Sequence, residues 1–517
     1  MHKIDMENRD YIIGIDIGSS SVAMAVGVRN EGGEITVLGV DLQPIEDCVK
    51  DGDILNYIEL GNAIGRAKSA LESELGIRLN SAYVGISGRS VYCVRYEDYV
   101  EISERNGCVT ENELRELNAR IEMVVSGGGD EIIERIPLRY TIDDNQSVRN
   151  PLGAFGRKLS ATYLFVLAGK HLIDRVNRAL YRADIKSCGL CVNPTILPEL
   201  LLTPDEMETG VAIVDIGSDL TDISIVREGK LWYFSSLPIG ASSINNDLHD
   251  FLKISKKDID SLKRKFGSAM ASGVPDNTTV PVKMAGHAKK QILQRNIAEI
   301  AEERLKDIAR FIMRELKGAK FVSKIPCGVV LTGGSAYLSN IDQLFARELD
   351  MEVRLGTMLN GLDDESQEKV LALPQSVVMG LLLYGAKHNA CEIVPERPKS
   401  IAAEGVRKVE VSTPNDIFTA VKSDIQTEVV KPVAVEPIVE TVVVEPVVQP
   451  IAEPQSKLQT EPQTEPEKQP EEVVAPQVEP KKVSEPEPKK EPEKKSRGWW
   501  DKVLDWVDDR FVSDKYI

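Results

Sequence analysis

Along the first part of the chain, apolar residues alternate with polar ones in strand-like runs and helix-like stripes. Residues 11–28 form an apolar run, a small polar turn at Gly18, Ser19 and Ser20, and an alternating return run, which is the pattern of a β-hairpin. Strands follow over 36–42, 82–87, 91–94, 131–142 and 159–168, with helices over 57–75 and 171–183. Thr110 and Glu113 open another helix with a capping box. The alternation predicts an α/β protein.

The hairpin pattern occurs a second time over residues 210–226. Asp-Ile-Gly-Ser begins at Asp16 in the first copy and at Asp215 in the second, each time after a β-branched run. Internal repeats point to duplicated structural units. Two such hairpins, one in each of two lobes, are suited to gripping a triphosphate from both sides. A single hairpin would equally fit the plain interpretation of two strands joined by a polar turn.

The turn residues indicate how a phosphate would be bound. Gly18 closes the first turn without a Cβ, so the amides from Gly18 to Ser21 can point into one small space that suits a phosphate. Asp16, at the strand end, is better placed to hold Mg2+ through water. The second turn supplies Gly217, Ser218 and the hydroxyl of Thr221.

A third glycine-rich element lies at residues 328–341. It combines a strand, the pair Gly333 and Gly334, and an apparent helix start. A glycine pair lets the backbone approach a ligand closely, and a helix N-terminus favours negative charge. The three elements in this order predict a nucleotide cleft.

The remaining pattern divides the chain into lobes, an inserted domain and a tail. Residues 240–320 are predicted to be mostly helical. They contain a helix over 257–266, a polar interruption at 272–281 and a long charged helix over 288–316. A strand over 327–332, a helix over 338–349 and an apolar core helix within 377–386 complete the elements. The predicted boundaries are a first lobe of 1–80, 165–193 and 375–390, an inserted small domain of 81–164, a second lobe of 194–239 and 321–374, a helical subdomain of 240–320, a linker of 391–495 and a terminal helix of 496–517.

The composition changes at residue 391. Pro, Glu, Val, Lys and Gln dominate up to residue 495, which holds most of the chain's 27 prolines and predicts a disordered, partly polyproline linker. A helix after it would carry an apolar face of Trp499, Trp500, Val503, Leu504, Trp506, Val507 and Phe511. We interpret this helix as an interfacial membrane anchor. Its acidic polar face weakens the interpretation, although lysines precede it, and the alternative is a helix that docks into a partner's groove.

Charge and cysteine usage narrow the class of protein. The 517-residue chain has a formal charge of −18, which argues against a nucleic-acid partner because phosphate backbones attract clustered Lys and Arg. No apolar run approaches ~18 residues, and residues 1–11 are polar, so we expect no membrane span and no signal peptide. Seven cysteines with irregular spacing suit a reducing cytosol. For the lone C-x-x-C of Cys188 and Cys191, we favour buried thiols over zinc or redox chemistry.

These features resemble the actin-like ATPase superfamily and, within it, the FtsA family of bacterial cell division proteins. The resemblance covers roughly residues 11–390. It rests on the two hairpins, on Thr-Gly-Gly-Ser at 332–335, and on VGISGRSV at 84–91, RNPLGAFGRKL at 149–159 and LPIGASSINNDL at 237–248. It implies an actin-like two-lobed α/β fold with duplicated RNase H-like domains and an inserted small domain, which is its most specific part.

The resemblance also implies a function. Such a protein binds ATP, polymerises like actin and links the division-ring tubulin homologue FtsZ to the cytoplasmic membrane through its tail helix. Residues 240–320 would contact FtsZ, and the inserted domain would help in self-assembly and in recruiting later division proteins. The protein would be peripheral, on the cytoplasmic side of the membrane at the division site.

The nucleotide-binding residues combine the turn residues with those that the resemblance implies. They are Asp16, Gly18, Ser19, Ser20, Ser21, Asp215, Gly217, Ser218, Asp219, Thr221, Gly240, Lys263, Gly333, Gly334 and Ser335. Asp16 and Asp215 would hold Mg2+ through water, Gly333 to Ser335 would lie at the adenine, and Lys263 would stack over the base unless it is a surface charge.

Two residues depart from the family pattern. Asp219 replaces a glycine at the γ-phosphate loop and would repel phosphate oxygens unless Mg2+ or an outward rotation relieves the repulsion. Asn193 occupies the place of a Glu or Gln that orients the attacking water in hydrolytic relatives. Because Asn is shorter and cannot act as a base, we expect ATP to be hydrolysed slowly or not at all.

Three relatives of the same superfamily are alternatives. A sugar or acetate kinase would need a substrate pocket and a catalytic Asp, and would have no use for the tether. A chaperone of the Hsp70 type would need a β-rich domain after residue 390. A PilM-like pilus-assembly adaptor shares the inserted small domain but lacks the amphipathic tail.

Overall fold

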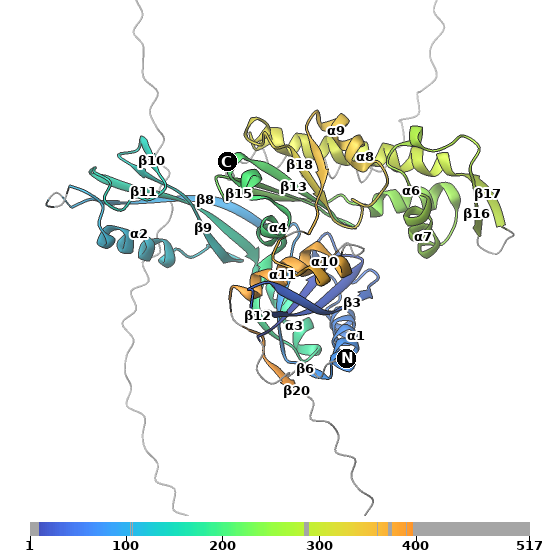
Figure 1. Cartoon of the computed structure of the whole chain (residues 1–517), viewed down its shortest axis with the longest axis horizontal. Coiled ribbons are helices and arrows are strands. Elements are labelled where there is room, and N and C mark those ends of the chain that lie inside the picture. The colour runs from blue at the N-terminus through green and yellow to red at the C-terminus, as the bar shows by residue number, and fades with distance from the viewer. Residues whose placement is uncertain are drawn as a thin grey trace, which may run out of the picture. The chain divides into compact units, whose positions relative to one another are not determined.

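A computed structural model describes residues 10–395 of the chain, apart from residues 104, 106, 284–288, 359, 371–374 and 389 (Figure 1). The predicted linker beyond residue 395 and the predicted terminal helix of 496–517, with its tryptophan face, lie outside the described residues. No described helix is both long enough and apolar enough to cross a membrane.

The first lobe is built on a five-stranded sheet of order β12-β7-β1-β2-β3. Its strands are β1 (Tyr11–Ile17), β2 (Ser21–Arg29), β3 (Ile35–Pro44), β7 (Ser81–Ile86) and β12 (Lys186–Val192). The first three form an antiparallel meander, and β7 and β12 run parallel to β1. The hairpin predicted over residues 11–28 is therefore confirmed.

The second lobe repeats this arrangement strand by strand. Its sheet has the order β15-β14-β13-β18-β19. The strands are β13 (Val211–Ile216), β14 (Thr221–Arg227), β15 (Lys230–Leu237), β18 (Val329–Thr332) and β19 (Val353–Leu355). The first three again form an antiparallel meander, with β18 and β19 parallel to β13. The duplication predicted from the repeated Asp-Ile-Gly-Ser is confirmed.

Helices cover both faces of the first sheet. On one face lies α1 (Tyr57–Leu75), which begins at the Asn56 cap, ends at the left-handed Gly76 and packs on α3 (Lys170–Arg182). On the other lie α4 (Asn193–Leu201) and α11 (Ser376–Ala386). The helices predicted over 57–75 and 171–183 and the apolar core helix within 377–386 are confirmed.

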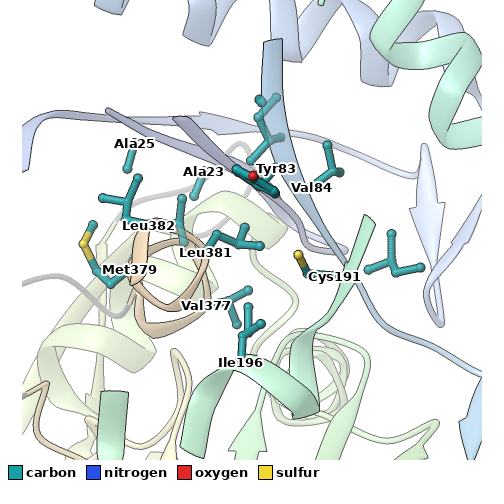
Figure 2. Packing of buried hydrophobic residues seen from close by; sticks show 14 of the residues in the cluster. Ala23, Ala25, Tyr83, Val84, Cys191, Ile196, Val377, Met379, Leu381 and Leu382 are labelled. Carbon is teal, nitrogen blue, oxygen red and sulfur yellow. The ribbon is translucent and has the colours of Figure 1, made fainter. Parts of the chain in front are cut away.

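Helix α11 is the most deeply buried element of the first lobe. Nearly all of its residues are buried, as expected for a helix that is apolar all round. Figure 2 shows Leu381 and Leu382 packed towards Ala23 and Ala25 of β2, with α4 close by. Helix α11 also reaches the second lobe, because Thr332 Oγ1 donates a buried hydrogen bond of 3.0 Å to Ser376 Oγ.

Strand β13 is apolar from Val211 to Val214 because it faces two cores. Val211 and Ile213 belong to the core of the first lobe and α4, whereas Ala212, Val214 and Ile216 belong to the core of the second lobe. Successive side chains of a strand point to opposite faces, so both faces of this sheet are covered. The two lobes therefore share a packed layer between their sheets.

The inserted domain has a sheet and a core of its own. Its elements are β8 (Val91–Glu101), α2 (Glu111–Met123), β9 (Asp130–Ile142), β10 (Gln146–Val148) and β11 (Lys158–Gly169), in the sheet order β10-β9-β11-β8. Helix α2 packs on β8 (Figure 1). The predicted capping box of Thr110 and Glu113 is present. The strand predicted over 82–87 is not part of this domain, because β7 pairs with β1 and β12 in the first sheet.

The helical block of the second lobe differs from the prediction in one place. Its elements are α6 (Ser242–Leu252), α7 (Lys256–Phe266), β16 (Thr279–Lys283), β17 (Lys289–Leu293) and α8 (Gln294–Gly318). Outside this block, α5 (Pro204–Thr209) packs on β14 and α9 (Ile341–Leu349) on α8, whereas α10 (Asp364–Val370), predicted within the second lobe, packs on β3 of the first lobe. The prediction that the long helix begins at residue 288 is wrong, because residues 289–293 pair with β16 as a hairpin. The Gln294 amide donates to the Thr278 carbonyl at 2.9 Å, which fixes where the helix begins.

Four further short strands are described in the first lobe, and the last of them lies within the predicted linker. Strands β4 (Val49–Lys50) and β5 (Asp53–Ile54) form a small hairpin, and β6 (Ile77–Leu79) pairs with β20 (Ile393–Pro395). Cys391 is buried. The prediction that the linker begins at residue 391 is therefore wrong, because the folded lobe extends at least to Pro395.

Candidate functional site

The two repeated hairpins end in turns of the same geometry. In the first, the Gly18 amide donates to the Ser21 carbonyl at 3.1 Å, and in the second the Gly217 amide donates to the Leu220 carbonyl at 2.9 Å. Ile17 pairs with Val22, and Ile216 pairs with Thr221 in the same way. Ser19 and Ser20 of the first turn thus correspond to Ser218 and Asp219 of the second.

This correspondence corrects two details of the predicted phosphate site. The Gly18 amide is used within its own turn, so the amides available to a ligand begin at Ser19. Thr221 lies beyond its turn, in the strand, where its counterpart is the core residue Val22. The Thr221 side chain is fully buried and its hydroxyl donates to the Ile239 carbonyl at 2.8 Å. Thr221 therefore supports the turn from below.

Three carboxylates gather where the two hairpins face each other. Asp16 and Asp215 end the equivalent strands β1 and β13, and Asp222 is the direct cross-strand partner of Asp215. Burial, and next the charge of Asp222, raise the pKa of Asp215 to about 8; burial and Asp222 also raise that of Asp16 to about 7, against a hydrogen bond from Asn193. Burial raises the pKa of Asp222 as well. Like charges on paired strand positions repel each other, so this site requires a cation or protons.

Asp222 also joins the two lobes, and sequence reasoning missed it. Its Oδ2 accepts a hydrogen bond of 2.5 Å from Ser87, which follows β7 in the first lobe, and Ser87 Oγ lies 3.3 Å from Ser236 Oγ of β15. Oδ1 of Asp222 is buried and has no hydrogen-bond partner among the described residues. Had the length of the turn between Asp215 and Asp222 been counted, the sequence would have placed both carboxylates on one face of the hairpin.

Asn193 is held against the first hairpin. It begins α4, is buried, and its Nδ2 donates to Asp16 Oδ1 at 3.4 Å. Its Oδ1 has no partner among the described residues and lies so close to Gly85 that a Cβ there would be 2.6 Å away. The amide of Asn193 is therefore committed to positioning Asp16.

The third predicted element closes onto the second hairpin. Gly333 has φ +90°, and a Cβ on it would lie 2.2 Å from Asp215 Oδ1, so only glycine fits beside this carboxylate. Ser335 is buried, and its amide donates to the Ile216 carbonyl at 3.4 Å. Gly334 between them is exposed, with open space where a side chain would stand.

The helix predicted directly after this glycine pair begins later. Residues 333–340 form turns, and α9 begins at Ile341 after a left-handed Asn340. The predicted start at residue 338 and the predicted contribution of a helix N-terminus at Gly333-Gly334 are therefore wrong. The close packing of Gly333 on Asp215 bends the chain before a helix can form.

Two other predicted residues lie behind the site. Gly240 packs against the second turn: a Cβ there would be 2.3 Å from the Ser218 carbonyl oxygen, and the Ala241 and Ser242 amides donate to the turn carbonyls. Lys263 on α7 is buried, which lowers its pKa, so the alternative interpretation as a surface charge is wrong. The segment that follows α7 is connected to residues 333–340, which begin with the glycine pair, by the β-bridge between Ser268 and Ser339.

A further pair of carboxylates faces across the site. Asp51 lies in the turn between β4 and β5, where Gly52 packs so closely that a Cβ would be 2.4 Å from the Ser87 carbonyl oxygen. Burial, and next the charge of Asp219, raise the pKa of Asp51. Asp219 is thus near enough to the first lobe to repel Asp51. The Asp-Gly pair between two short strands was the sequence signal for this turn.

The donor set fits a hydrated cation rather than a directly bound metal. Within the described part of the chain, no group of three or more His, Cys, Asp or Glu side chains could hold a metal ion directly. Among the described residues, no positive charge acts on the buried carboxylates of Asp16 and Asp215, and the buried Oδ1 atoms of Asp222 and Asn193 have no hydrogen-bond donor. Hard cations that keep several waters are bound through one or two carboxylates in this manner.

Comparison with known proteins finds cell division proteins of the FtsA type. A family model described as "Cell division protein FtsA" matches residues 212–375, and one described as "SHS2 domain inserted in FTSA" matches residues 88–167. The cell division protein FtsA of Pseudomonas aeruginosa is 29% identical over 393 residues, which cover 74% of this chain and 91% of that protein. That of Escherichia coli K12 is 28% identical over 404 residues, covering 75% and 93%. The chain is thus similar to the cell division protein FtsA over about three quarters of its length.

The FtsA homologues support an actin-like cell division protein, and the matches confirm the predicted fold class, with an SHS2 domain as the insertion. Among solved structures, a PilM–PilN type IV pilus biogenesis complex aligns with a TM-score of 0.51 at 15% identity, covering 72% of this chain and 98% of that one. This likeness shows the shared fold alone and does not favour the pilus-assembly alternative.

The raised pKa values predict how the ligand-free protein responds to pH. A carboxyl whose pKa is raised in the folded state stabilises the fold at low pH, and that contribution is lost as the pH rises towards the folded value, about 8 for Asp215. Asp215→Asn removes the ionisation. We expect its Tm, measured without metal or nucleotide, to exceed that of the wild type by roughly 2–6 °C at pH 8 and by little at pH 5.

Asp350→Asn is the matched control, since Asp350 is exposed and has a left-handed backbone that Asn tolerates. Its Tm difference from the wild type should be the same at both pH values. A Tm for Asp215→Asn below that of the wild type at pH 8 would contradict the electrostatic interpretation of the site.

Proposed function

We propose that the chain binds ATP with Mg2+ between its two lobes, assembles into actin-like polymers and tethers FtsZ to the inner face of the cytoplasmic membrane. The similarity to cell division proteins FtsA supports the cell division role. The observation that carries the nucleotide part is the set of three desolvated carboxylates, two of them on equivalent strands of the duplicated lobes, beside two turns of equal geometry.

The residues of the site suggest how each part of the ligand would be held. The amides of Ser19, Ser20 and Ser218 would bind phosphate oxygens, and Asp16 and Asp215 would hold the hydrated Mg2+. Asp222 would be satisfied by the waters of that ion. Bound Mg2+ supplies positive charge that screens the phosphates from the carboxylates. The exposed Gly334, beside Ser335 and α7 with Lys263, is the surface that we assign to the adenine side.

The same site favours ATP as an assembly ligand over rapid hydrolysis. A water-orienting residue needs a side chain that can reach and polarise the attacking water. Asn193 donates to Asp16, and its Oδ1 is enclosed next to Gly85. Asp219 adds negative charge where the family has a glycine, and it already repels Asp51. We infer that the bound nucleotide sets the assembly state and turns over slowly.

The remaining parts of the proposal concern partners. Residues 240–320 are the candidate FtsZ contact, and the SHS2 domain is the candidate surface for self-assembly and for later division proteins. The predicted apolar face of the terminal helix is the candidate membrane anchor, on a tether of about a hundred residues. The protein would then be peripheral, on the cytoplasmic side of the membrane at the division site.

Gly334 offers a direct test of nucleotide binding. Because the space around it is open, Gly334→Val should leave the Tm of the ligand-free chain within about 2 °C. The added side chain would occupy the ligand's place, so we expect the affinity for Mg2+-ATP, measured by isothermal titration calorimetry, to fall at least about tenfold. Gly127→Val, also in open space but in the inserted domain, should bind as the wild type does. Equal affinity for Gly334→Val and the wild type would refute the assigned site.

The rate of phosphate release tests the role of Asn193. We expect the purified chain to release phosphate from Mg2+-ATP at on the order of one turnover per minute or less, as for nucleotide sites that lack a completing catalytic group. Brisk release that is lost in Asn193→Ala, but kept in Asn118→Ala, would show that Asn193 positions the attacking water after all. Asn118 is a suitable control because it lies in the inserted domain, where its Oδ1 accepts a hydrogen bond from the Tyr163 hydroxyl.

Vesicle sedimentation tests the tether. The full chain should pellet with vesicles containing anionic phospholipids and carry FtsZ with it, whereas a chain ending at Arg497 should stay in solution with FtsZ. Trp506→Glu, on the predicted apolar face, should reduce the pelleted fraction several-fold, and Lys502→Gln, on the polar face, should reduce it far less. If the truncated chain pellets as well as the full one, the terminal helix is not the anchor.

A further inference from the structure

Two cysteines that are far apart in the sequence lie in contact on the first lobe. Cys188 is on β12, Cys391 follows α11, and their sulfur atoms are 3.5 Å apart although 203 residues separate them. Cys188 is exposed and Cys391 is buried. An accessible thiol next to a second, sheltered thiol is the arrangement found at cysteines that react reversibly with oxidants.

The surroundings of the two thiols divide their roles. The hydrogen bond to Cys391 is the main cause that lowers the pKa of Cys188 to about 7, and the Ser81 hydroxyl contributes. The same hydrogen bond, together with burial, raises the pKa of Cys391. At neutral pH Cys188 therefore has substantial thiolate character, and the thiolate is the form that attacks an oxidant. Cys391 keeps its proton and can act second.

The neighbour that the sequence suggests for Cys188 is excluded by the fold. Cys191 is three residues away, but its side chain is buried and points into the core near Val377 and Ile196 (Figure 2). Burial, and next the charge of Glu134, raise the pKa of Cys191 to about 12. The C-x-x-C of the sequence is therefore no pair, and the true partner of Cys188 comes from the other end of the folded chain.

Cys391 lies just before β20, the last element of the first lobe that the structure describes. Its amide donates to the Tyr11 carbonyl at 2.8 Å, and the Glu392 amide donates to Ser81 Oγ at 2.7 Å. Strand β20 follows directly, and beyond Pro395 the sequence continues to the predicted linker and tail helix. While the thiols are reduced, this junction is held to the first lobe by these hydrogen bonds, by the ion pair of Glu392 with Lys186 and by the burial of Cys391 in the core.

We propose that Cys188 is a peroxide-reactive thiol that forms a reversible disulfide with Cys391 and so fastens the root of the C-terminal segment to the first lobe. The Cys188 thiolate attacks the O–O bond of hydrogen peroxide, which gives a sulfenic acid and, after proton uptake, one water. The Cys391 thiol then attacks the Cys188 sulfur, so the S–S bond forms and the second water leaves. Two thiols are oxidised, one peroxide is reduced, and a dithiol reductant reverses the change.

The geometry asks for a small movement only. A disulfide has an S–S distance of about 2.05 Å, so the sulfur atoms must approach by roughly 1.5 Å from their present 3.5 Å. Cys188 is on an edge strand of the sheet and is exposed, which leaves its side chain free to rotate towards Cys391. This site does not depend on nucleotide or membrane binding.

The test uses the full chain treated with one equivalent of hydrogen peroxide under native conditions. We expect the intact mass to fall by about 2 Da, as two thiols become one disulfide, and peptide mapping to link Cys188 to Cys391. Closing a loop of this length should raise the Tm by roughly 5 °C, and dithiothreitol should reverse the rise. In Cys391→Ser, a sulfenic acid should instead accumulate at Cys188, trapped as a dimedone adduct.

Matched variants decide between this pair and other thiols. Cys188→Ser should lose the 2 Da change, whereas Cys191→Ser and Cys327→Ser should keep it, since neither residue takes part. Alkylation of Cys188 at pH 7 should be at least about tenfold faster than that of Cys108. A link between Cys188 and Cys191, a disulfide between two chains, or equal alkylation rates at Cys188 and Cys108 would overturn the proposal.

Discussion

Negative charge that is gathered between the two hairpins is the constraint on which the functional part of this protein depends. Asp16 and Asp215 come from equivalent strands of the duplicated lobes, and Asp222 lies opposite Asp215. Burial raises the pKa of all three carboxyl groups, and the charge of Asp222 raises the pKa of Asp16 and of Asp215 further. Such a cluster is stable only when protons or a cation neutralise it. The site therefore links the protonation of these carboxyl groups to the stability of the ligand-free fold.

The packed layer between the sheets holds this charge in place. Helix α11 fits against β1 because Gly14 has no side chain: a Cβ there would lie 2.9 Å from Leu381 Cβ. Its first residue, Ser376, accepts the buried hydrogen bond from Thr332, the strand neighbour of Asp215. Because close-packed interiors transmit displacements and do not absorb them, a shift at one hairpin would be felt by the other lobe through α4 and α11.

Electrostatic repulsion also acts at the rim of the site. Asp51 lies on the small β4–β5 hairpin, and burial, and next the negative charge of Asp219 on the second turn, raise its pKa. The positive charges of Lys50 and Arg89 lower the pKa of Asp51, but each has a smaller effect than Asp219. Ser87 provides the opposite tendency, since it binds Asp222 across the lobes and supports Gly52 from behind. The first lobe is thus attracted to the second at Ser87 and repelled at Asp51. A cation bound between them would favour the closed arrangement.

Local pattern alone determined the element types, the repeated hairpins, the capped helices and the residues of both turns, because these depend on neighbours within a few positions. Tertiary structure decided which groups meet. In the folded protein the Thr221 side chain is buried, the Gly18 amide is bonded within its own turn, and α8 begins six residues later than the periodicity suggested. The fold also brings Asp222 and Asp51 to the site. It also replaced the apparent Cys188–Cys191 pair by Cys188–Cys391. Contacts between distant segments depend on how sheets and helices pack, and a spacing in the sequence carries no information about that packing.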